Sequence, residues 1–311
     1  MKTRHLGKTG LQVPVLGFGT SPLGSMFSEV DEQDGIRTVH EVLDLSINFI
    51  DTAPLYGPLK AEIILGKALK DVPRDSYLLS TKAGRYKWTE YDFTSEGIVL
   101  SLEESLQRLN TDYVDIFQLH DIEYTSLEEV AEICIPTLQR LKQQGKIRFY
   151  GVTGFPMKTF RYILENAEID TMLSYCHYSL NNTTLLDLLP LVKEKNVGLM
   201  SASPLSMGLL SKKGVPFWHP ADEEIKELAS KAIRFCEERG ENLEKLALQF
   251  SVQNEQIPVT LVGSTNPKNI RRNIAWIEEP INDDLLKQVQ EILKPIHNRC
   301  WSSGRPENDD I

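Results

Sequence analysis

Four residues with acid–base chemistry lie at or just after short apolar runs in the first 120 residues. Asp51 ends INFID, Tyr56 follows in DTAPLYG, Lys82 ends YLLSTK and His120 ends VDIFQLH. A phenol has a pKa near 10, and a neighbouring ammonium lowers it. A carboxylate would position the ammonium, and an imidazole could donate to a substrate oxygen. If the fold brings them together, the four side chains predict proton transfer at an alcohol or carbonyl, although each alone is better explained as a cap, loop or core residue.

The elements that would position these residues form a repeated alternation. Helical patterns separate the apolar runs, and they lie at residues 32–45, 95–109, 127–144, 156–165, 185–194 and 267–277. The runs are apolar throughout, which is typical of a parallel sheet covered by helices. We interpret eight runs as strands: 15–20, 47–51, 77–82, 114–120, 148–153, 171–175, 197–202 and 259–263. Eight such units predict an α/β fold, a (β/α)8 TIM barrel.

Both ends of the chain carry additional elements. Residues 3–13 predict an N-terminal β-hairpin, and residues 282–294 predict a C-terminal extra helix. The tail from residue 301 to residue 311 is polar, and we expect it to be loose. No linker divides the chain, so residues 1–311 are predicted to form a single domain. In such a barrel the carboxyl ends of the strands share one face, where Asp51, Lys82 and His120 would meet.

Composition and charge exclude several classes of function. The chain has 311 residues, 41% of them hydrophobic, and a formal net charge of −10, which disfavours nucleic acid and anionic membranes as partners. The histidines and the four widely spaced cysteines show no metal-ligand spacing, so no metal is expected and the thiols are expected to be reduced and mostly buried. The opening MKTRHLGKTG lacks the apolar segment of a secretory signal, which predicts a cytoplasmic protein. We expect the protein to be a monomer or homodimer.

The common nucleotide and nucleophile motifs are missing. GFGTSP, at residues 17–22, has Pro22 where a dinucleotide fingerprint would have its third glycine. The chain contains no phosphate-binding P-loop and no G-x-S-x-G nucleophile turn. A classical dinucleotide fold and a serine hydrolase are therefore disfavoured.

The segments NFIDTAPLYG, LLSTKAG and SLEESLQRLNTDYVDIFQLH resemble the aldo-keto reductase family, and the resemblance covers nearly the whole chain. It implies a (β/α)8 barrel that binds a nicotinamide cofactor without a Rossmann fold. It also implies roles for the four residues. Tyr56 would be the acid or base, Lys82 would tune it, Asp51 would pair with Lys82, and His120 would orient the substrate.

The cofactor residues depart from the family pattern in three places. The Ser-Asn pair after the fifth strand is Thr153-Gly154 here, the following Gln corresponds to Tyr175, and the aromatic residue of the seventh strand corresponds to Ala202. We hypothesise that Tyr175 supplies the missing ring. Ser203–Leu209 resembles the pyrophosphate loop. The resemblance implies these cofactor contacts: Gly19, Thr20, Thr153, Tyr175, Ser203, Leu205, Ser206, Gly208, Gly263, Ser264, Thr265, Asn269, Arg272 and Asn273.

The last cofactor segment, residues 262–273, bears on the choice between NAD and NADP. Relatives that prefer NADP have a Lys near Gly263 and an Arg near Asn269, and both cations are missing here. Arg271 and Arg272 are adjacent on a predicted helix, so their side chains point about 100° apart and at most one faces the ribose. We therefore predict NAD as the cofactor, with NADP as the alternative.

A branch of the family indicates the substrate. LSYCHYSLNNTTLLDLLP, SASPLSMGLL and VPFWHPA resemble aldose 1-dehydrogenases. This implies oxidation of the anomeric carbon of a free aldose, of the L-galactose, L-fucose or D-arabinose type, to the lactone. Candidate contacts to such a small-molecule sugar are Tyr86, Trp88, Asp121 and Glu123. The alternatives are a general NAD(P)H-dependent aldehyde or ketone reductase, a pyridoxal-type dehydrogenase, and a regulatory binding protein on a reductase scaffold.

Overall fold

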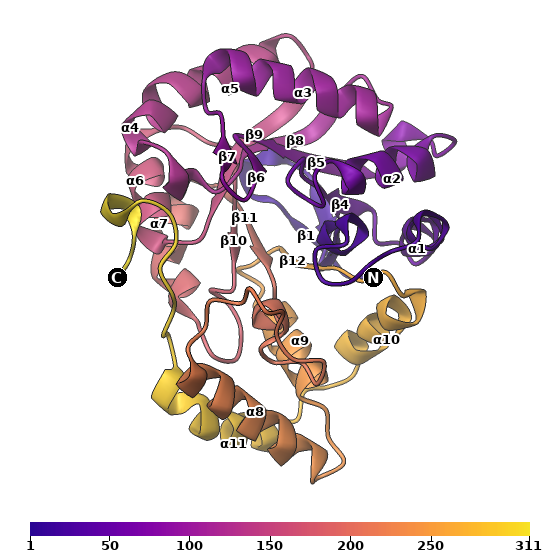
Figure 1. Cartoon of the computed structure of the whole chain (residues 1–311), viewed down its shortest axis with the longest axis vertical. Coiled ribbons are helices and arrows are strands. Elements are labelled where there is room, and N and C mark those ends of the chain that lie inside the picture. Colours follow the sequence, from indigo (N-terminus) through magenta and orange to yellow (C-terminus); the bar gives the residue numbers. More distant parts are fainter.

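The computed structural model describes all residues, 1–311. Eight parallel strands close into a barrel, in the order β10-β11-β12-β3-β4-β5-β8-β9 (Figure 1). They are β3 (Leu16–Gly19), β4 (Phe49–Asp51), β5 (Leu78–Ala83), β8 (Val114–Leu119), β9 (Ile147–Gly154), β10 (Thr171–Tyr175), β11 (Gly198–Ala202) and β12 (Val259–Val262). Each predicted strand is present within two residues of its expected bounds. The predicted (β/α)8 barrel is therefore confirmed.

Helices cover the outside of this barrel. Those that the sequence predicted are α1 (Glu32–Asp44), α3 (Ser95–Leu109), α4 (Leu127–Glu129) with α5 (Ile135–Gln143), α6 (Met157–Asn166), α7 (Leu189–Glu194), α10 (Pro267–Glu278) and α11 (Asp283–Leu293). Side-chain caps begin several of them, including Asp31 before α1 and Thr94 before α3. Residues 127–143 are continuous but contain a π-helical stretch at 130–134, and residues 184–188 form a 3-10 helix before α7.

Three helices were not predicted: α2 (Lys60–Leu69), α8 (Glu223–Glu237) and α9 (Leu243–Gln253). In α8 the buried residues Ile225, Ala229, Ala232 and Cys236 recur at helical spacing on one face, so this amphipathic pattern could have been identified from the sequence. In α9 the polar side chains of Gln249 and Ser251 are buried among apolar ones, so its periodicity is blurred. Both lie between β11 and β12, where the chain inserts more than one helix.

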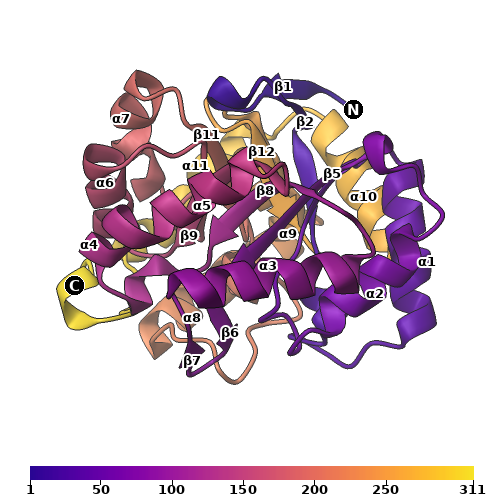
Figure 2. The ribbon, with the colours of Figure 1, turned by 90° about the horizontal axis from the view of Figure 1, so that it is seen from above.

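The N-terminal hairpin closes one end of the barrel. β1 (Thr3–His5) pairs antiparallel with β2 (Gln12–Pro14), as predicted. Its side chains Leu6, Leu11 and Val13 join one apolar cluster with barrel residues such as Phe49 and Met200. Figure 2 shows this hairpin at the opposite end of the molecule from the small sheet of β6 (Arg85–Lys87) and β7 (Glu90–Tyr91). The other end therefore stays available for a site.

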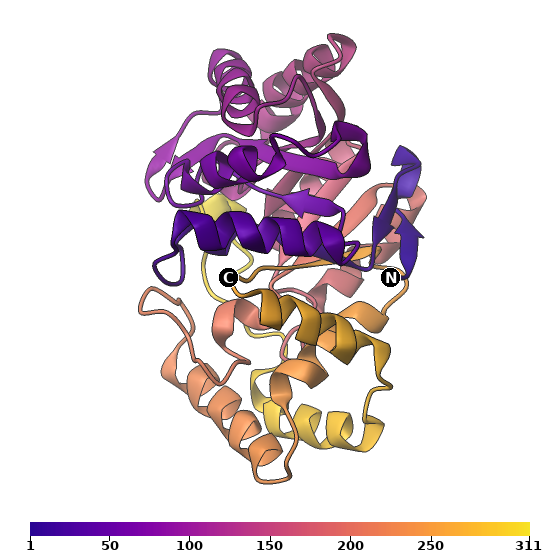
Figure 3. The ribbon, with the colours of Figure 1, turned by 90° about the vertical axis from the view of Figure 1, so that its right-hand side faces the viewer.

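The C-terminal elements pack differently from the prediction of a loose tail. α8 and α11 pack together below the barrel, around a second apolar cluster that includes Ile225 and Val289 (Figure 3). From α11 the chain runs back to the barrel, where Asp310 accepts hydrogen bonds from the first backbone N–H groups of α6 at 2.6 and 2.9 Å. The tail is thus docked because its polar side chains satisfy backbone groups of remote elements.

Three further features accompany the fold. All four cysteines are free thiols; Cys134, Cys176 and Cys236 are buried and Cys300 is half-buried, as expected. None of the helices is both long enough and apolar enough to cross a membrane. No group of three or more His, Cys, Asp or Glu side chains is arranged to hold a metal ion.

Candidate active site

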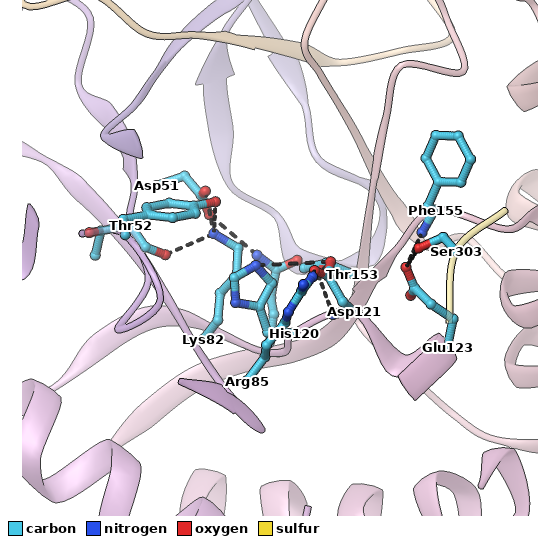
Figure 4. Close-up of polar contacts among 12 residues, drawn as sticks. Asp51, Thr52, Lys82, Arg85, His120, Asp121, Glu123, Thr153, Phe155 and Ser303 are labelled. Carbon is cyan, nitrogen blue, oxygen red and sulfur yellow. Dashed lines mark hydrogen bonds and ion pairs between the residues drawn. The ribbon is translucent and has the colours of Figure 1, made fainter. Parts of the chain in front are cut away.

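The four acid–base residues of the sequence meet at the carboxyl ends of neighbouring strands. Asp51 ends β4, Lys82 is the penultimate residue of β5, and His120 follows β8. Lys82 Nζ donates to Asp51 Oδ2 at 2.5 Å and to the carbonyl of Thr52 at 2.8 Å (Figure 4). It also donates to Tyr56 Oη at 3.1 Å. An ammonium has three N–H donors, and here each has an acceptor.

This arrangement leaves the proton of the phenol free for a substrate. Because Tyr56 Oη accepts from Lys82, its own O–H does not have to donate to that residue. Burial raises the pKa of Tyr56 above its ordinary value, and Lys82 opposes this effect without cancelling it. The sequence predicts that the ammonium lowers this pKa, and the structure shows the opposite direction. In the buried cluster the cost of desolvating a phenolate is larger, so the phenol is protonated at neutral pH.

His120 lies beside the phenol as a neutral imidazole. The two rings meet edge to face, with centroids 5.8 Å apart. Burial lowers the pKa of His120 to about 3, since a charged imidazole would lose its hydration next to Lys82. Its Nδ1 has no hydrogen-bond partner within the protein. A neutral imidazole can donate one hydrogen bond to a substrate oxygen without moving a charge.

The four side chains lie in the wall of an open cavity of about 1090 Å³. A cavity of this size exceeds what one small substrate needs. Of the predicted cofactor contacts, these line it: Gly19, Thr153, Tyr175, Ser203, Leu205, Gly208, Gly263, Ser264, Thr265, Asn269, Arg272 and Asn273. Of the predicted substrate contacts, Trp88 and Asp121 line it.

Four predicted contacts lie elsewhere. Thr20 and Ser206 are fully buried behind the wall, and Ser206 Oγ donates to Asn181 at 2.8 Å. Tyr86 turns away from the cavity and donates to the carbonyl of Gly97 at 3.1 Å. Glu123 lies under the C-terminal tail, where its Oε1 accepts from Ser303 at 3.0 Å. These side chains support the wall rather than form it.

The end of the cavity remote from Tyr56 carries the polar residues around α10. The side chain of Arg271 points away and pairs with Glu41 at 2.6 and 2.8 Å. Arg272 lines the cavity, and its Cζ atom lies 4.3 Å from the ring centre of Trp276. Its Nη2 donates to Glu244 Oε2 at 3.3 Å. Only one of these two adjacent arginines therefore faces the site, as expected.

The shape and donors of the cavity fit a dinucleotide. One end has the acid–base cluster, and the other has the amides of Asn269 and Asn273 beside a guanidinium. Between them, Ser203 and Gly208 adopt positive φ angles of 59° and 102°, which turn the backbone sharply at the wall. Backbone N–H groups in such turns are suited to phosphate oxygens.

The structure also adds Arg85, which sequence reasoning missed, and it places Trp218, which the sequence predicts to be a lid or structural residue after the pyrophosphate loop, in the cavity wall. Arg85 lines the cavity and pairs with Asp121. Trp218 contacts both Phe27 and Trp88, with ring centroids 5.8 and 5.6 Å apart, so three separate loops meet at the cavity mouth. The only sequence signal for Arg85 was its place in KAGRY, directly after the strand that carries Lys82.

Comparison with known proteins identifies the family of the chain. The model of the Aldo/keto reductase family matches residues 15–294. The chain is 47% identical to the L-galactose dehydrogenase of Arabidopsis thaliana, over 99% of both chains. It is 32% identical to the D-arabinose 1-dehydrogenase of Saccharomyces cerevisiae, over 85% of this chain and 86% of that protein.

A solved structure shows the same fold. The holo form of an aldo-keto reductase from Bacillus halodurans superimposes with a TM-score of 0.77 at 28% identity, covering 94% of this chain and 96% of that one. The barrel and the arrangement of its strands are therefore features that this chain has in common with a solved structure.

Proposed function

The chain belongs to the aldo/keto reductase family, and from that premise we propose that this oxidoreductase is an NAD-dependent aldose 1-dehydrogenase. Its substrate is a free aldose of the L-galactose type, and its product is the corresponding lactone. The observation that carries the proposal is the intact cluster of Asp51, Tyr56, Lys82 and His120 in the cavity wall. The similarity to the L-galactose dehydrogenase of Arabidopsis thaliana supports the sugar as substrate.

The residues of the chain supply the proton chemistry. In oxidation the anomeric hydroxyl of the cyclic sugar loses its proton to the oxygen of Tyr56, while Lys82 stabilises the phenolate that accepts it. His120 donates a hydrogen bond to the same substrate oxygen and orients it. A bound nicotinamide dinucleotide would accept the hydride from the anomeric carbon. Asp51 keeps Lys82 charged and in place throughout, because the two are in direct contact.

The polar end of the cavity supports NAD over NADP. Residues around Gly263 and Asn269 would hold the adenosine, and the nearby cation Arg272 is engaged by Glu244. A carboxylate beside the ribose accepts hydrogen bonds from the two hydroxyls of NAD and repels the 2′-phosphate of NADP. We expect a lower dissociation constant for NAD than for NADP. Glu244→Gln should narrow that difference, as measured by quenching of tryptophan fluorescence, and an unchanged ratio would remove Glu244 from the argument.

One assay tests the function directly. Formation of reduced cofactor is followed from NAD and from NADP with L-galactose, L-fucose, D-arabinose, D-galactose and D-glucose. We expect strong turnover of L-galactose or a configurational relative with NAD. No turnover with any of the five sugars, together with reduction of simple aldehydes by the reduced cofactor, would contradict the proposal. The protein would then be a general aldehyde or ketone reductase.

A further inference from the structure

A buried ion pair lies in the cavity wall next to the acid–base cluster. Arg85 Nη1 donates to Asp121 Oδ2, and both side chains are almost fully buried while lining the cavity (Figure 4). Asp121 directly follows His120, whose Nε2 lies 3.9 Å from Asp121 Oδ1. The pair is therefore adjacent to the group that would contact the reacting oxygen of a substrate.

Aromatic rings fix the orientation of the guanidinium. The Cζ atom of Arg85 lies 4.5 Å from the ring centre of Tyr124, 5.4 Å from that of Trp88 and 5.7 Å from that of Tyr91. Tyr91 and Tyr124 are themselves stacked, with centroids 4.8 Å apart. A guanidinium between such rings has few alternative positions, so its N–H donors are pre-organised.

Asp121 is held as firmly as its partner. Its backbone adopts a φ of 54°, a left-handed conformation that is uncommon outside glycine, asparagine and aspartate. Its backbone N–H donates to Thr153 Oγ1 at 3.0 Å, which ties it to the end of β9. The carboxylate therefore has a defined position between His120 and Arg85.

A second arginine shows what a purely structural pair looks like in this protein. All three guanidinium nitrogens of Arg74 have acceptors, and its partner Asp115 also accepts from Arg148 and from the backbone of Leu79. In contrast, Arg85 makes a single side-chain hydrogen bond, from Nη1 to Asp121, and its Nη2 is left without an acceptor. A buried ion pair contributes little net stability by itself, so incompletely used donors in a cavity wall indicate binding.

We propose that Arg85 and Asp121 form the subsite that recognises the sugar hydroxyl next to the reacting carbon. This inference rests on the proposed aldose dehydrogenase function and makes it more specific. A hydroxyl group both donates and accepts, so one hydroxyl can donate to Asp121 and accept from Arg85. The aromatic rings around Arg85 supply the apolar wall for the C–H face of the sugar ring. The pair thus makes this hydroxyl a requirement for a good substrate.

The test compares a sugar with an analogue that lacks one hydroxyl. L-Galactose and 2-deoxy-L-galactose are assayed with NAD, using the wild-type protein, Arg85→Lys and Asp121→Asn. We expect the wild type to prefer L-galactose by tenfold or more in kcat/KM, because a site built for a hydroxyl rejects an analogue without it. Both variants should raise KM for L-galactose by about tenfold and change kcat/KM for the 2-deoxy sugar by less than about threefold.

The control variant is Arg74→Lys, which changes a paired arginine outside the cavity. It should leave the preference between the two sugars unchanged. Arg85→Lys keeps the charge that Asp121 needs, and the dissociation constant for NAD reports whether each variant is folded. The preference of the wild type between the two sugars tests the subsite without depending on the folding of any variant.

Three results would overturn the inference. A wild-type enzyme that oxidises both sugars equally well has no such subsite. Equal losses for both sugars in the variants would mean that the pair supports His120 or the fold instead of recognising a hydroxyl. A wild type that oxidises neither sugar would remove the aldose dehydrogenase function, and this subsite with it, so the two failures are distinguishable.

Discussion

Two buried carboxyl groups near the cavity differ in what surrounds them. Asp51 contacts the ammonium of Lys82 at 2.5 Å, within a cluster whose charges are matched. Glu123 has no cation in hydrogen-bond contact; its Oε1 accepts from the backbone N–H of Phe155 at 3.2 Å and from Ser303, and its Oε2 has no partner. Burial and the charge of Asp121 raise the pKa of Glu123 to about 8.

The comparison shows how one residue type serves two purposes. A buried carboxylate that is paired stays charged and can keep a neighbouring ammonium in place for chemistry. A buried carboxyl group without a cation takes up a proton and becomes a neutral hydrogen-bonding group. Glu123, Ser303, Asn308 and Asp310 belong to what we call the tail seam, the contact between the C-terminal tail and the barrel. Changes in the acid–base cluster should therefore alter turnover, and changes in the tail seam should alter stability, apart from Ser303, which also lines the cavity.

The largest expected effect is on the catalytic cluster. Tyr56→Phe removes the oxygen that exchanges a proton with the substrate, so turnover should fall by about 10²-fold or more. The dissociation constant for NAD and the free energy of unfolding should change little, because the ring still fits its site. Steady-state kinetics and denaturant unfolding measure the two. Wild-type turnover in this variant would remove Tyr56 from the mechanism.

The pH dependence of kcat gives a second test of the role of Tyr56. In the proposed mechanism oxidation needs Tyr56 as the phenolate, and its raised pKa keeps the phenol protonated at neutral pH. The kcat for oxidation should therefore rise with pH, by up to tenfold per unit below that pKa, whereas reduction, which uses the protonated phenol, should stay flat near neutrality.

Lys82→Met tests whether Lys82 lowers the pKa of Tyr56. Loss of the ammonium removes the influence that lowers the pKa of Tyr56, so the oxidation profile should move to higher pH or activity should vanish. The measurement is the pH dependence of kcat, alongside the free energy of unfolding, because Asp51 is left buried without its partner. An unchanged profile in an active variant would show that Lys82 does not tune the phenol.

A change at Glu123 should alter the pH dependence of stability and leave turnover nearly unchanged, in contrast to changes at Tyr56 and Lys82. Its pKa is about 8 in the folded chain and near 4.5 when unfolded, so between these values the folded chain binds more protons. This contribution to stability is complete below pH 4.5 and is lost as pH rises toward 8, at no more than about 1.4 kcal/mol per pH unit. Glu123→Gln should flatten that slope and leave turnover near wild type. Denaturant unfolding at pH 6 and pH 8.5 measures it, and parallel slopes in the two proteins would contradict the assignment.

The smallest expected effect is at the end of the tail seam. Asp310 accepts from the backbone N–H groups of Met157 and Lys158, as an N-cap supplied from far along the chain. Asp310→Ala should cost about 1 kcal/mol of unfolding free energy. Turnover at saturating substrate should not change. A variant as stable as the wild type would mean that the tail is not anchored there.

Local sequence patterns were sufficient to predict most of the strands and the position of the acid–base residues. Apolar runs predicted the strands, and the order of Asp51, Lys82 and His120 at successive strand ends predicted that they meet, because the carboxyl ends of parallel strands share one face. Sequence reasoning missed α9 because polar residues on its buried face weaken the periodic signal. The pattern of α8 is clearly amphipathic and could have been identified from the sequence.

The sequence alone therefore determined the barrel, its hairpin and the acid–base cluster, since each depends on periodicity or on strand ends. Only the tertiary structure decided that burial outweighs Lys82 in setting the pKa of Tyr56. It also decided that Arg85 pairs with Asp121 and that the polar tail docks on Glu123. These outcomes depend on desolvation and on contacts between residues distant in the chain, and no local pattern encodes either.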